Sequence, residues 1–420
     1  MTEVIKIEGG HKLKGTVRIS SAKNATVALI PAAILAHESV VDIFGVPNIA
    51  DVKSLTVLLN ELGVDVSFDN EDHYKIDTTK MKNITLEHDA VTKLRASYYF
   101  MGALLGKYKY VKMQMPGGCY LGPRPIDLHL KGFEALGATV DYKQGYYEIY
   151  ADKLVGSKIF LDIASVGATM NIMLAAVLAE GKTVIENAAK EPEIIDLATF
   201  LNKMGAIVRG AGTSVITIEG VESLTGSTHE IIPDRIEAGT YIIMAAAMGE
   251  EVRVENIIPL HLDALTSKLI EMGVNIETGT DYAIVKSNGR LNPIDIQTLP
   301  YPGFATDLQQ PLTTLLTQAE GQSTVRETIY FERFKHTHEL EKMGAKIQVN
   351  TPQALINGPT ELYGTKVEAT DLRCGAALVV AGLMAQGVTE IHEIYHIDRG
   401  YQNIVEKLTN LGAKIWRETI

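Results

Sequence analysis

The sequence predicts an α/β protein of two similar lobes, each made of three copies of one unit whose sheets pack around buried helices. Three observations support this fold class. A glycine-centred motif recurs six times at a nearly constant interval, a second and far more apolar helix accompanies each copy, and 420 residues with 46% hydrophobic content suffice for more than one core. We therefore expect two domains.

The repeated motif is an apolar residue, two variable residues, Leu or Met, Gly, a small residue or Val, a variable residue, and Val or Ile. Its six copies read LNELGVDV, FEALGATV, LNKMGAIV, LIEMGVNI, LEKMGAKI and LTNLGAKI. Successive glycines are 74, 68, 68, 71 and 68 residues apart, and they are Gly63, Gly137, Gly205, Gly273, Gly344 and Gly412. Such regularity indicates one structural unit repeated along the whole chain.

Each copy is predicted to end an amphipathic helix and to begin a strand. Glycine just after a helix adopts the left-handed conformation at little cost, which stops the helix. The first copy shows both periods. Helical spacing connects Val52, Leu55, Leu58, Leu59 and Leu62. Beyond Gly63, alternation connects Val64, Val66 and Phe68.

A second helix in each unit is apolar on most sides, which is typical of a helix buried on all sides. These helices fall in residues 25–36, 96–106, 167–181, 238–249, 311–321 and 375–387. Sheets are therefore expected to surround them, in two lobes of three units. The periodicity alone does not show where the chain crosses between the lobes.

Polar residues gather just before these buried helices, in the segments SSAKNA, TKLRAS, ASVGAT, PDRIEAGT, FATDLQQP and TDLRCGA. A helix N-terminus offers unpaired N–H groups and about half a positive charge, so it attracts anions. The alternative is that Asp234 and Asp371 only cap their helices. Capping explains Lys23, Arg95 and Arg373 poorly, because a cation opposes the helix dipole there. We therefore predict a bound anion.

A loop rich in glycine and proline, residues 115–125, contains Cys119. Three glycines and two prolines lie between Met115 and Pro123, a composition typical of a loop. A structural cysteine is usually buried in a helix or strand, as we expect for Cys374. Cys119 is instead predicted to have a chemical role, as a thiol that can donate a proton or, beside Arg124, ionise. Arg399, taken alone, indicates only a surface salt bridge.

The composition excludes several classes of protein. A formal charge of −12 argues against a general nucleic-acid binder, and no apolar run reaches the roughly 18 residues that span a bilayer. The N-terminal residues do not resemble a secretory signal, and two distant cysteines support neither a disulfide framework nor a metal cluster. The protein is expected in the cytoplasm, without a metal or cofactor. Its protein partners are not indicated.

From Ile5 to about Trp416 the chain resembles the bacterial UDP-N-acetylglucosamine 1-carboxyvinyltransferases, a family of enolpyruvyl transferases. The resemblance rests on SAKNA, LRAS, PGGCYLGPRPIDLH, SVGAT, ENAAKEPEIID, PDRIEAGT, FATDLQ, TDLRCGAALV and YHIDRGY. It implies an inside-out α/β barrel of two lobes, each of three βαβαββ units, with the active site in the cleft between them. Residues 1–22 and 231–420 would form the first lobe and residues 23–230 the second, with crossings near Lys23 and Pro233.

The resemblance also implies a reaction, in which the enolpyruvyl group of phosphoenolpyruvate moves to the 3′-hydroxyl of UDP-N-acetylglucosamine and phosphate is released. Phosphoenolpyruvate would be bound by Lys23, Asn24, Arg124, Arg399 and, ranked second, Arg373. The sugar nucleotide would contact Arg95, Arg124, Pro125, Ile126, Asp127, Leu128, Ser165, Val166, Gly167, Asp307 and Ile329. The catalytic residues would be Lys23, Cys119 as proton donor and covalent adduct site, and Asp307 as base.

One position departs from the family pattern, because some members have Lys where this chain has Ile163. Binding of the diphosphate must then depend on other donors. Two alternatives remain open. The first is the sibling enzyme that acts on shikimate 3-phosphate, which lacks the cysteine loop. The second is a non-catalytic UDP-sugar sensor, which would not need Lys23, Cys119, Asp307 and Arg399 together.

Overall fold

The computed structural model describes residues 2–70, 72–117 and 126–420. They form two compact units. Unit 1 comprises residues 2–20 and 233–420, and unit 2 comprises the described residues between 21 and 232. Each unit has its own hydrophobic core. Within the described part of the chain, no helix is both long enough and apolar enough to cross a membrane.

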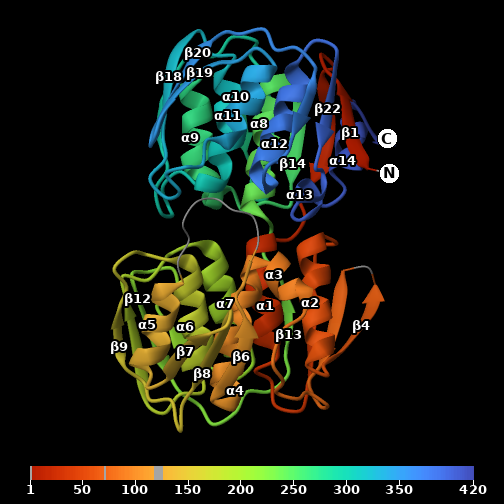
Figure 1. The fold of residues 1–420 in the computed structure, drawn as a ribbon. Helices are drawn as coiled ribbons and strands as arrows, with labels where there is room; N and C mark the ends of the chain where they lie inside the picture. Colours follow the sequence, from red (N-terminus) through yellow and green to blue (C-terminus); the bar gives the residue numbers. More distant parts are fainter. Residues whose placement is uncertain (1, 71, 118–125) are drawn as a thin grey trace. The chain divides into compact units, whose positions relative to one another are not determined.

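Unit 1 contains three sheets of four strands each (Figure 1). Its strands are β1 (Glu3–Glu8), β2 (Leu13–Arg18), β14 (Gly249–Glu255), β15 (Asn275–Thr278), β16 (Tyr282–Lys286), β17 (Asp295–Gln297), β18 (Gly321–Arg326), β19 (Lys346–Asn350), β20 (Gln353–Gly358), β21 (Lys366–Glu368), β22 (Val388–His392) and β23 (Lys414–Thr419). Its helices are α8 (Arg235–Met248), η2 (Pro259–Leu262), α9 (Asp263–Glu271), η3 (Thr306–Leu308), α10 (Gln309–Leu316), α11 (Lys335–Lys342), α12 (Leu372–Met384), α13 (Tyr395–Asp398) and α14 (Ile404–Asn410). The buried helices α8, α10 and α12 pack against one another.

Unit 2 contains two four-stranded sheets and one three-stranded sheet among its described residues. Its strands are β3 (Val40–Phe44), β4 (Asp65–Asn70), β5 (His73–Asp77), β6 (Tyr110–Gln114), β7 (Thr139–Lys143), β8 (Tyr146–Tyr150), β9 (Lys158–Phe160), β10 (Lys182–Glu186), β11 (Ile207–Arg209), β12 (Val215–Glu219) and β13 (Thr228–Glu230). Its helices are α1 (Lys23–Ala33), α2 (Ala50–Glu61), α3 (Asp89–Lys93), η1 (Arg95–Tyr98), α4 (Tyr99–Tyr108), α5 (Asp127–Ala135), α6 (Val166–Ala176) and α7 (Pro192–Lys203). The buried helix α4 packs against α1 and α6.

The segment from β9 to β12 shows one complete unit in uninterrupted sequence. Strand β9, helix α6, strand β10, helix α7 and the hairpin β11–β12 follow one another, and the sheet order is β11-β12-β10-β9. Strands β9 and β10 are parallel, while β12 is antiparallel to both β10 and β11. The segment from β17 to β20 repeats this arrangement. The predicted α/β fold of repeated βαβαββ units is confirmed.

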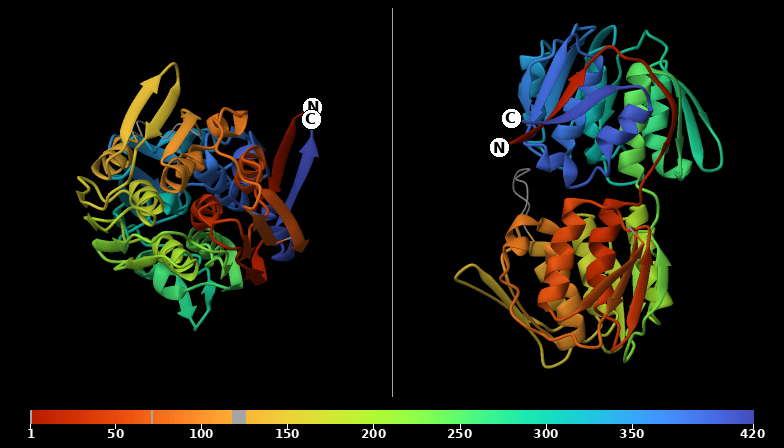
Figure 2. Two further views of the ribbon diagram at one scale, coloured as in Figure 1. Left: turned by 90° about the horizontal axis from the view of Figure 1, so that it is seen from below. Right: turned by 90° about the vertical axis from the view of Figure 1, so that its right-hand side faces the viewer.

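Three sheets combine strands that are distant in sequence. In unit 1, β2 pairs in parallel with β14, although helix α1 of unit 2 follows β2 in the chain. In unit 2, β13 pairs in parallel with β3, although α8 of unit 1 follows β13. The N-terminal β1 lies between β22 and β23 and is antiparallel to both. Both views in Figure 2 accordingly place the two chain ends next to each other.

All six repeat glycines end their amphipathic helices as predicted, with φ between 74° and 107°. In the first copy the Gly63 N–H donates to the Asn60 carbonyl and the Val64 N–H donates to the Leu59 carbonyl, both at 3.0 Å. This pair of bonds is the Schellman motif, and the other five copies have the same pair. The residue that accepts the second bond is fully buried in every copy, as Leu59, Phe133, Leu201, Leu269, Leu340 and Leu408.

Candidate functional site

Lys23 is the first residue of α1 and lies beside an acidic partner. Its Nζ is 3.1 Å from Oδ2 of Asp51, a buried residue in the first turn of α2. The preceding residue is Ala22, whose methyl group cannot cap the helix. The Asp51 carboxylate therefore offsets part of the unfavourable interaction between Lys23 and the helix dipole. Asn24 follows Lys23 in the same turn and is half-buried.

A second group of predicted residues in unit 2 surrounds His129 of α5. The buried His129 ring lies edge-on to the Tyr98 ring, with centroids 4.6 Å apart, and His129 Nδ1 is 3.0 Å from Asn171 Nδ2. Burial and then the charge of Arg95 lower the pKa of His129 to about 3. His129 is therefore neutral at physiological pH, and it lies close enough to Arg95 to interact with its charge.

The start of α6 approaches the same two rings. The Ser165 side chain caps α6 by accepting a hydrogen bond of 3.2 Å from the Ala168 N–H. A side chain at Gly167 would meet the Tyr98 hydroxyl at 2.6 Å and the His129 ring at 3.0 Å, so a larger residue there would have to displace one or both rings. Ile163, the position that departs from the family pattern, is exposed two residues before Ser165.

Unit 2 thus brings together Arg95 at the start of η1, Ser165–Gly167 at the start of α6 and the start of α5, where Ile126, Asp127 and Leu128 precede His129. We call these residues with Tyr98 and His129 the His129 cluster. Cys119, Arg124 and Pro125 lie outside the described residues.

Asp307 lies in the short helix η3 of unit 1, between two buried arginines. Arg333 Nη1 donates to Asp307 Oδ1 at 2.7 Å, and Arg373 Nη2 donates to Asp307 Oδ2 at 3.1 Å. Burial alone would lower the pKa of Arg333, but attraction to Asp307 and Asp371 outweighs it and the pKa is raised. Both guanidinium groups therefore stay charged and fix both oxygens of Asp307.

Arg373 is held from several sides in the first turn of α12. Its Nη1 donates to the Tyr401 hydroxyl at 3.0 Å, and that hydroxyl is 2.8 Å from the hydroxyl of Thr240. The Asp371 side chain caps α12 by accepting from the N–H groups of Arg373 and Cys374, and Asp234 caps α8 in the same way. The capping role considered for Asp234 and Asp371 is confirmed. Cys374 is buried, as expected, and burial raises the pKa of its thiol to about 12.

The other predicted residues of unit 1 lie near these arginines or on the adjoining turn. Arg399 directly follows α13 and is half-buried. Burial and then the charge of Arg399 lower the pKa of His396, while the charge of Asp371 opposes the shift. The Ile329 N–H donates to Glu327 at 2.9 Å. We call Thr306, Asp307, Arg333, Asp371, Arg373 and Tyr401 the Asp307 cluster.

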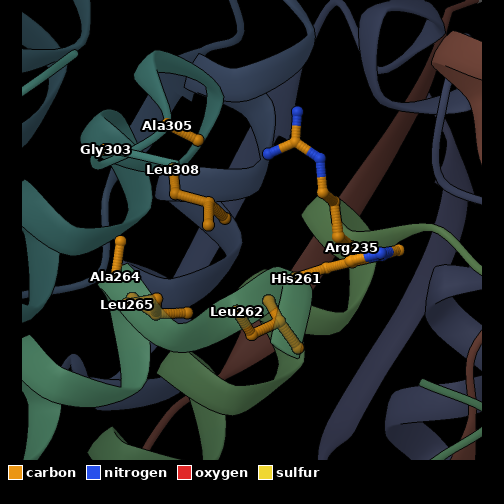
Figure 3. A pocket seen from close by; sticks show the side chains of 8 residues that line it. All are labelled: Arg235, His261, Leu262, Ala264, Leu265, Gly303, Ala305 and Leu308. Carbon is orange, nitrogen blue, oxygen red and sulfur yellow. The ribbon is translucent and has the colours of Figure 1, made fainter. Parts of the chain in front are cut away.

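A small pocket lies beside η3 (Figure 3). It is lined by Ala305 and Leu308, which flank Asp307, and by Arg235 at the start of α8. Arg235 lies over the Tyr301 ring, with its guanidinium carbon 5.5 Å from the ring centre. The pocket volume of about 10 Å³ is enough for one water molecule and not for either predicted substrate.

Sequence reasoning missed Arg333, Glu327 and His129. Each acts on a residue that belongs to another segment of the chain, so nothing in its own neighbourhood indicates the contact. His129 was the easiest to find, because it lies two residues beyond Asp127 in the IDLHL segment.

His336 of α11 provides a first testable prediction, on stability. It is fully buried, and neither ring nitrogen has a hydrogen-bond partner in the described part of the chain. Burial lowers its pKa to about 3, although Asp371 opposes the shift. An unfolded histidine titrates near pH 6.5. Between that pH and about pH 3, His336 is therefore protonated in the unfolded chain but neutral in the native chain. The contribution of neutral His336 to the unfolding free energy is fully present above pH 6.5 and is lost progressively as the pH falls toward 3.

Replacing His336 by phenylalanine removes this dependence. Between pH 7 and pH 5 the unfolding free energy of the parent should fall by about 2 kcal/mol more than that of His336→Phe. Chemical denaturation at the two pH values measures the difference. His338→Phe is the control, because His338 lies on the same helix with its side chain 76% exposed. Parallel pH dependence of the parent and His336→Phe would contradict the prediction.

The fold is that of the enolpyruvyl transferases. Residues 7–408 match the family model of EPSP synthase (3-phosphoshikimate 1-carboxyvinyltransferase), and the chain belongs to this family. Among solved structures it is similar to the enolpyruvyl transferase NikO from Streptomyces tendae, with a TM-score of 0.91 and 27% identity over 100% of this chain and 99% of that one. EPSP synthase from Acinetobacter baumannii shares the fold, with a TM-score of 0.75 and 18% identity over all of both chains.

The curated relatives share one name, which states a particular reaction within this family. The chain is 59% identical to "UDP-N-acetylglucosamine 1-carboxyvinyltransferase 2" of Geobacillus kaustophilus (strain HTA426), over 99% of this chain and 96% of the relative. It is 59% identical to the protein of the same name from Bacillus subtilis (strain 168), over 99% and 97%. For the Listeria monocytogenes serotype 4b protein of that name, identity is 57% over 100% and 99%.

Proposed function

We propose that this chain transfers the enolpyruvyl group of phosphoenolpyruvate to the 3′-hydroxyl of UDP-N-acetylglucosamine and releases phosphate, in the first committed step of peptidoglycan precursor synthesis. The observation that supports this most strongly is 59% identity over 99% of the chain to relatives named for that transfer. The expected compartment is the cytoplasm, on the basis of the composition alone.

The charges of the two substrates explain why the site needs several cations. Phosphoenolpyruvate has a phosphate and a carboxylate, and the acceptor has a diphosphate, so anions must be brought close together. Lys23 of unit 2 and Arg399 of unit 1 are proposed to bind phosphoenolpyruvate with Asn24, Arg124 and Arg373. The His129 cluster is proposed to bind the sugar nucleotide, where Arg95 and the backbone N–H groups at the start of α6 can meet the diphosphate.

The chemistry requires one proton to be removed and one to be supplied. In the addition step the acceptor oxygen bonds to C2 of phosphoenolpyruvate, its proton goes to Asp307, and Cys119 protonates the methylene carbon C3. In the elimination step C3 returns a proton to the Cys119 thiolate, the double bond re-forms, and the C2–O bond to phosphate breaks. A carboxylate has about four lone-pair sites, so Asp307 can hold both guanidinium groups and still accept from a hydroxyl.

Acceptor choice tests the proposed function. The parent protein mixed with phosphoenolpyruvate should release phosphate with UDP-N-acetylglucosamine and not with shikimate 3-phosphate, because the chain has the cysteine loop that the shikimate enzyme lacks. Phosphate release is measured with each acceptor and with none. Turnover with shikimate 3-phosphate alone would reassign the enzyme to its sibling. Binding of the sugar nucleotide without any phosphate release would indicate a sensor.

A further inference from the structure

Glu327, the residue directly after β18, is a buried carboxylate to which the proposed mechanism gives no task. Its side chain is completely buried. Among residues 2–70, 72–117 and 126–420 no cation forms a direct ion pair with it. Burying a carboxylate without a counter-ion is costly unless hydrogen bonds satisfy it. Five donors do so here, and they come from three separate segments.

One oxygen of Glu327 holds the turn that contains Ile329. Oε1 accepts from the Ile329 N–H at 2.9 Å and from the Tyr330 N–H at 3.0 Å. It also accepts from the Thr298 hydroxyl at 2.7 Å, and Thr298 in turn accepts from the Thr328 N–H at 2.9 Å. The peptide of Ile329, a predicted contact of the sugar nucleotide, is thereby fixed.

The other oxygen holds the turn that contains Asp307. Oε2 accepts from the Thr306 hydroxyl at 3.0 Å and from Gln309 Nε2 at 3.4 Å. Thr306 precedes Asp307 in the chain, and its hydroxyl also accepts from Arg333 Nη1 at 3.1 Å. The same Arg333 nitrogen donates to Asp307 at 2.7 Å. Thr306 therefore connects Glu327 to Asp307 both through the backbone and through Arg333.

We propose that Glu327 is a positioning residue that couples the sugar-contacting turn at Ile329 to Asp307. It acts through Thr306 and does not touch substrate, because it is completely buried and both of its oxygens are occupied by protein donors. The inference rests on the proposed function, since it assigns Glu327 a part in placing Asp307 against the acceptor hydroxyl.

Glu327→Gln should change the bonds to Thr306 and Gln309 and keep the bonds to Ile329 and Tyr330. Backbone N–H groups cannot become acceptors, so the amide oxygen must take the place of Oε1 and keep the bonds to Ile329 and Tyr330. The amide NH₂ then faces Thr306 and Gln309 at the place where both donated to Oε2. The Thr306 hydroxyl can then only accept a neutral bond from the NH₂, so the Asp307 turn loses its charge-assisted bonds to Oε2 while the Ile329 turn keeps its bonds to Oε1. The reaction step should therefore suffer more than binding.

The experiment measures kcat and both KM values for the parent, Glu327→Gln, Thr306→Val and the double variant. Glu327→Gln should lower kcat about 10- to 100-fold, the size expected for losing a hydrogen bond to a charged group, with each KM within about 3-fold of the parent. Thr306→Val should lower kcat similarly. The double variant should lose little more than either single variant, because both substitutions break one connection. Glu332→Gln, an exposed glutamate of the same segment, should match the parent.

Three results would overturn the inference. They are a kcat of Glu327→Gln within about 2-fold of the parent, losses that multiply in the double variant, and a rise in KM alone. Thermal melting identifies any loss due to unfolding, and Thr306→Val then tests the connection if Glu327→Gln does not fold. A parent that releases no phosphate with either acceptor would count against the proposed function instead, so the two failures can be told apart.

Discussion

Replacing Asp307 by asparagine is expected to lower kcat by about 10²- to 10⁴-fold, the range found when a positioned proton acceptor is removed. The amide is nearly the same size as the carboxylate but cannot take a proton from the acceptor hydroxyl. It also places an NH₂ group against one of two guanidinium groups that now hold oxygens at 2.7 and 3.1 Å. Steady-state phosphate release gives kcat, and calorimetry gives the affinity for UDP-N-acetylglucosamine.

The substitution also leaves two buried arginines without their shared counter-charge, which can cost about 3–5 kcal/mol of stability. Turnover must therefore be corrected for the folded fraction at the assay temperature. Asp281→Asn is a suitable control, because Asp281 is an exposed aspartate of the same unit. If folded Asp307→Asn keeps a kcat within about 3-fold of the parent, the proton acceptor lies elsewhere.

The second large effect is expected at Cys119. Cys119→Ala and Cys119→Ser should lose about 10²- to 10⁴-fold in kcat, since alanine has no proton and a serine hydroxyl is too weak an acid. Cys119→Asp should keep appreciable turnover, because a carboxylic acid of similar reach can donate. An aspartic acid is mostly ionised above its ordinary pKa of about 3.9, so the activity of this variant should shift toward acid pH. A pH series of kcat for the four proteins measures this.

Chemical labelling supplies the control for Cys119. Small electrophilic epoxides shaped like phosphoenolpyruvate should modify Cys119 and spare Cys374, whose thiol is buried and has its pKa raised to about 12. Cys119→Asp should resist these reagents. Equal turnover of Cys119→Ala and the parent across the pH range would show that the proton comes from another group.

The parts of the fold that depend on local sequence were predictable, and those that depend on distant pairing were not. Each repeat glycine determines its own helix end, so all six could be located from single segments. The pairing of β2 with β14 and of β13 with β3, and the insertion of β1 between β22 and β23, depend on partners more than 180 residues away along the chain. Hydrophobic periodicity contains no information about such partners.

The same distinction applies to the site. The motifs indicated Asp307 and Arg373, but the charge argument for a bound anion considered only residues of the same helix start. The structure places Asp51 beside Lys23 and Asp307 beside Arg373, so acidic groups from other elements also compensate these cations. Arg333 and Glu327 belong to a turn whose own sequence has no recognisable motif, and only their contacts with Thr306 and Asp307 reveal them.

The discontinuity of unit 1 has a consequence for how the chain folds during synthesis. The described residues of unit 2 all lie between residues 21 and 232, so all its strands have left the ribosome before most of unit 1 is made. Strands β1 and β2 are the first to emerge, yet β2 cannot pair until β14 has been synthesised, and β1 must wait for β22 and β23. Strand β1 therefore lacks its partners for almost the whole of translation, and β2 lacks its partner for more than half of it. Their charged residues, Glu3, Lys6, Glu8, Lys14 and Arg18, are of the kind that discourages edge-to-edge association during that interval.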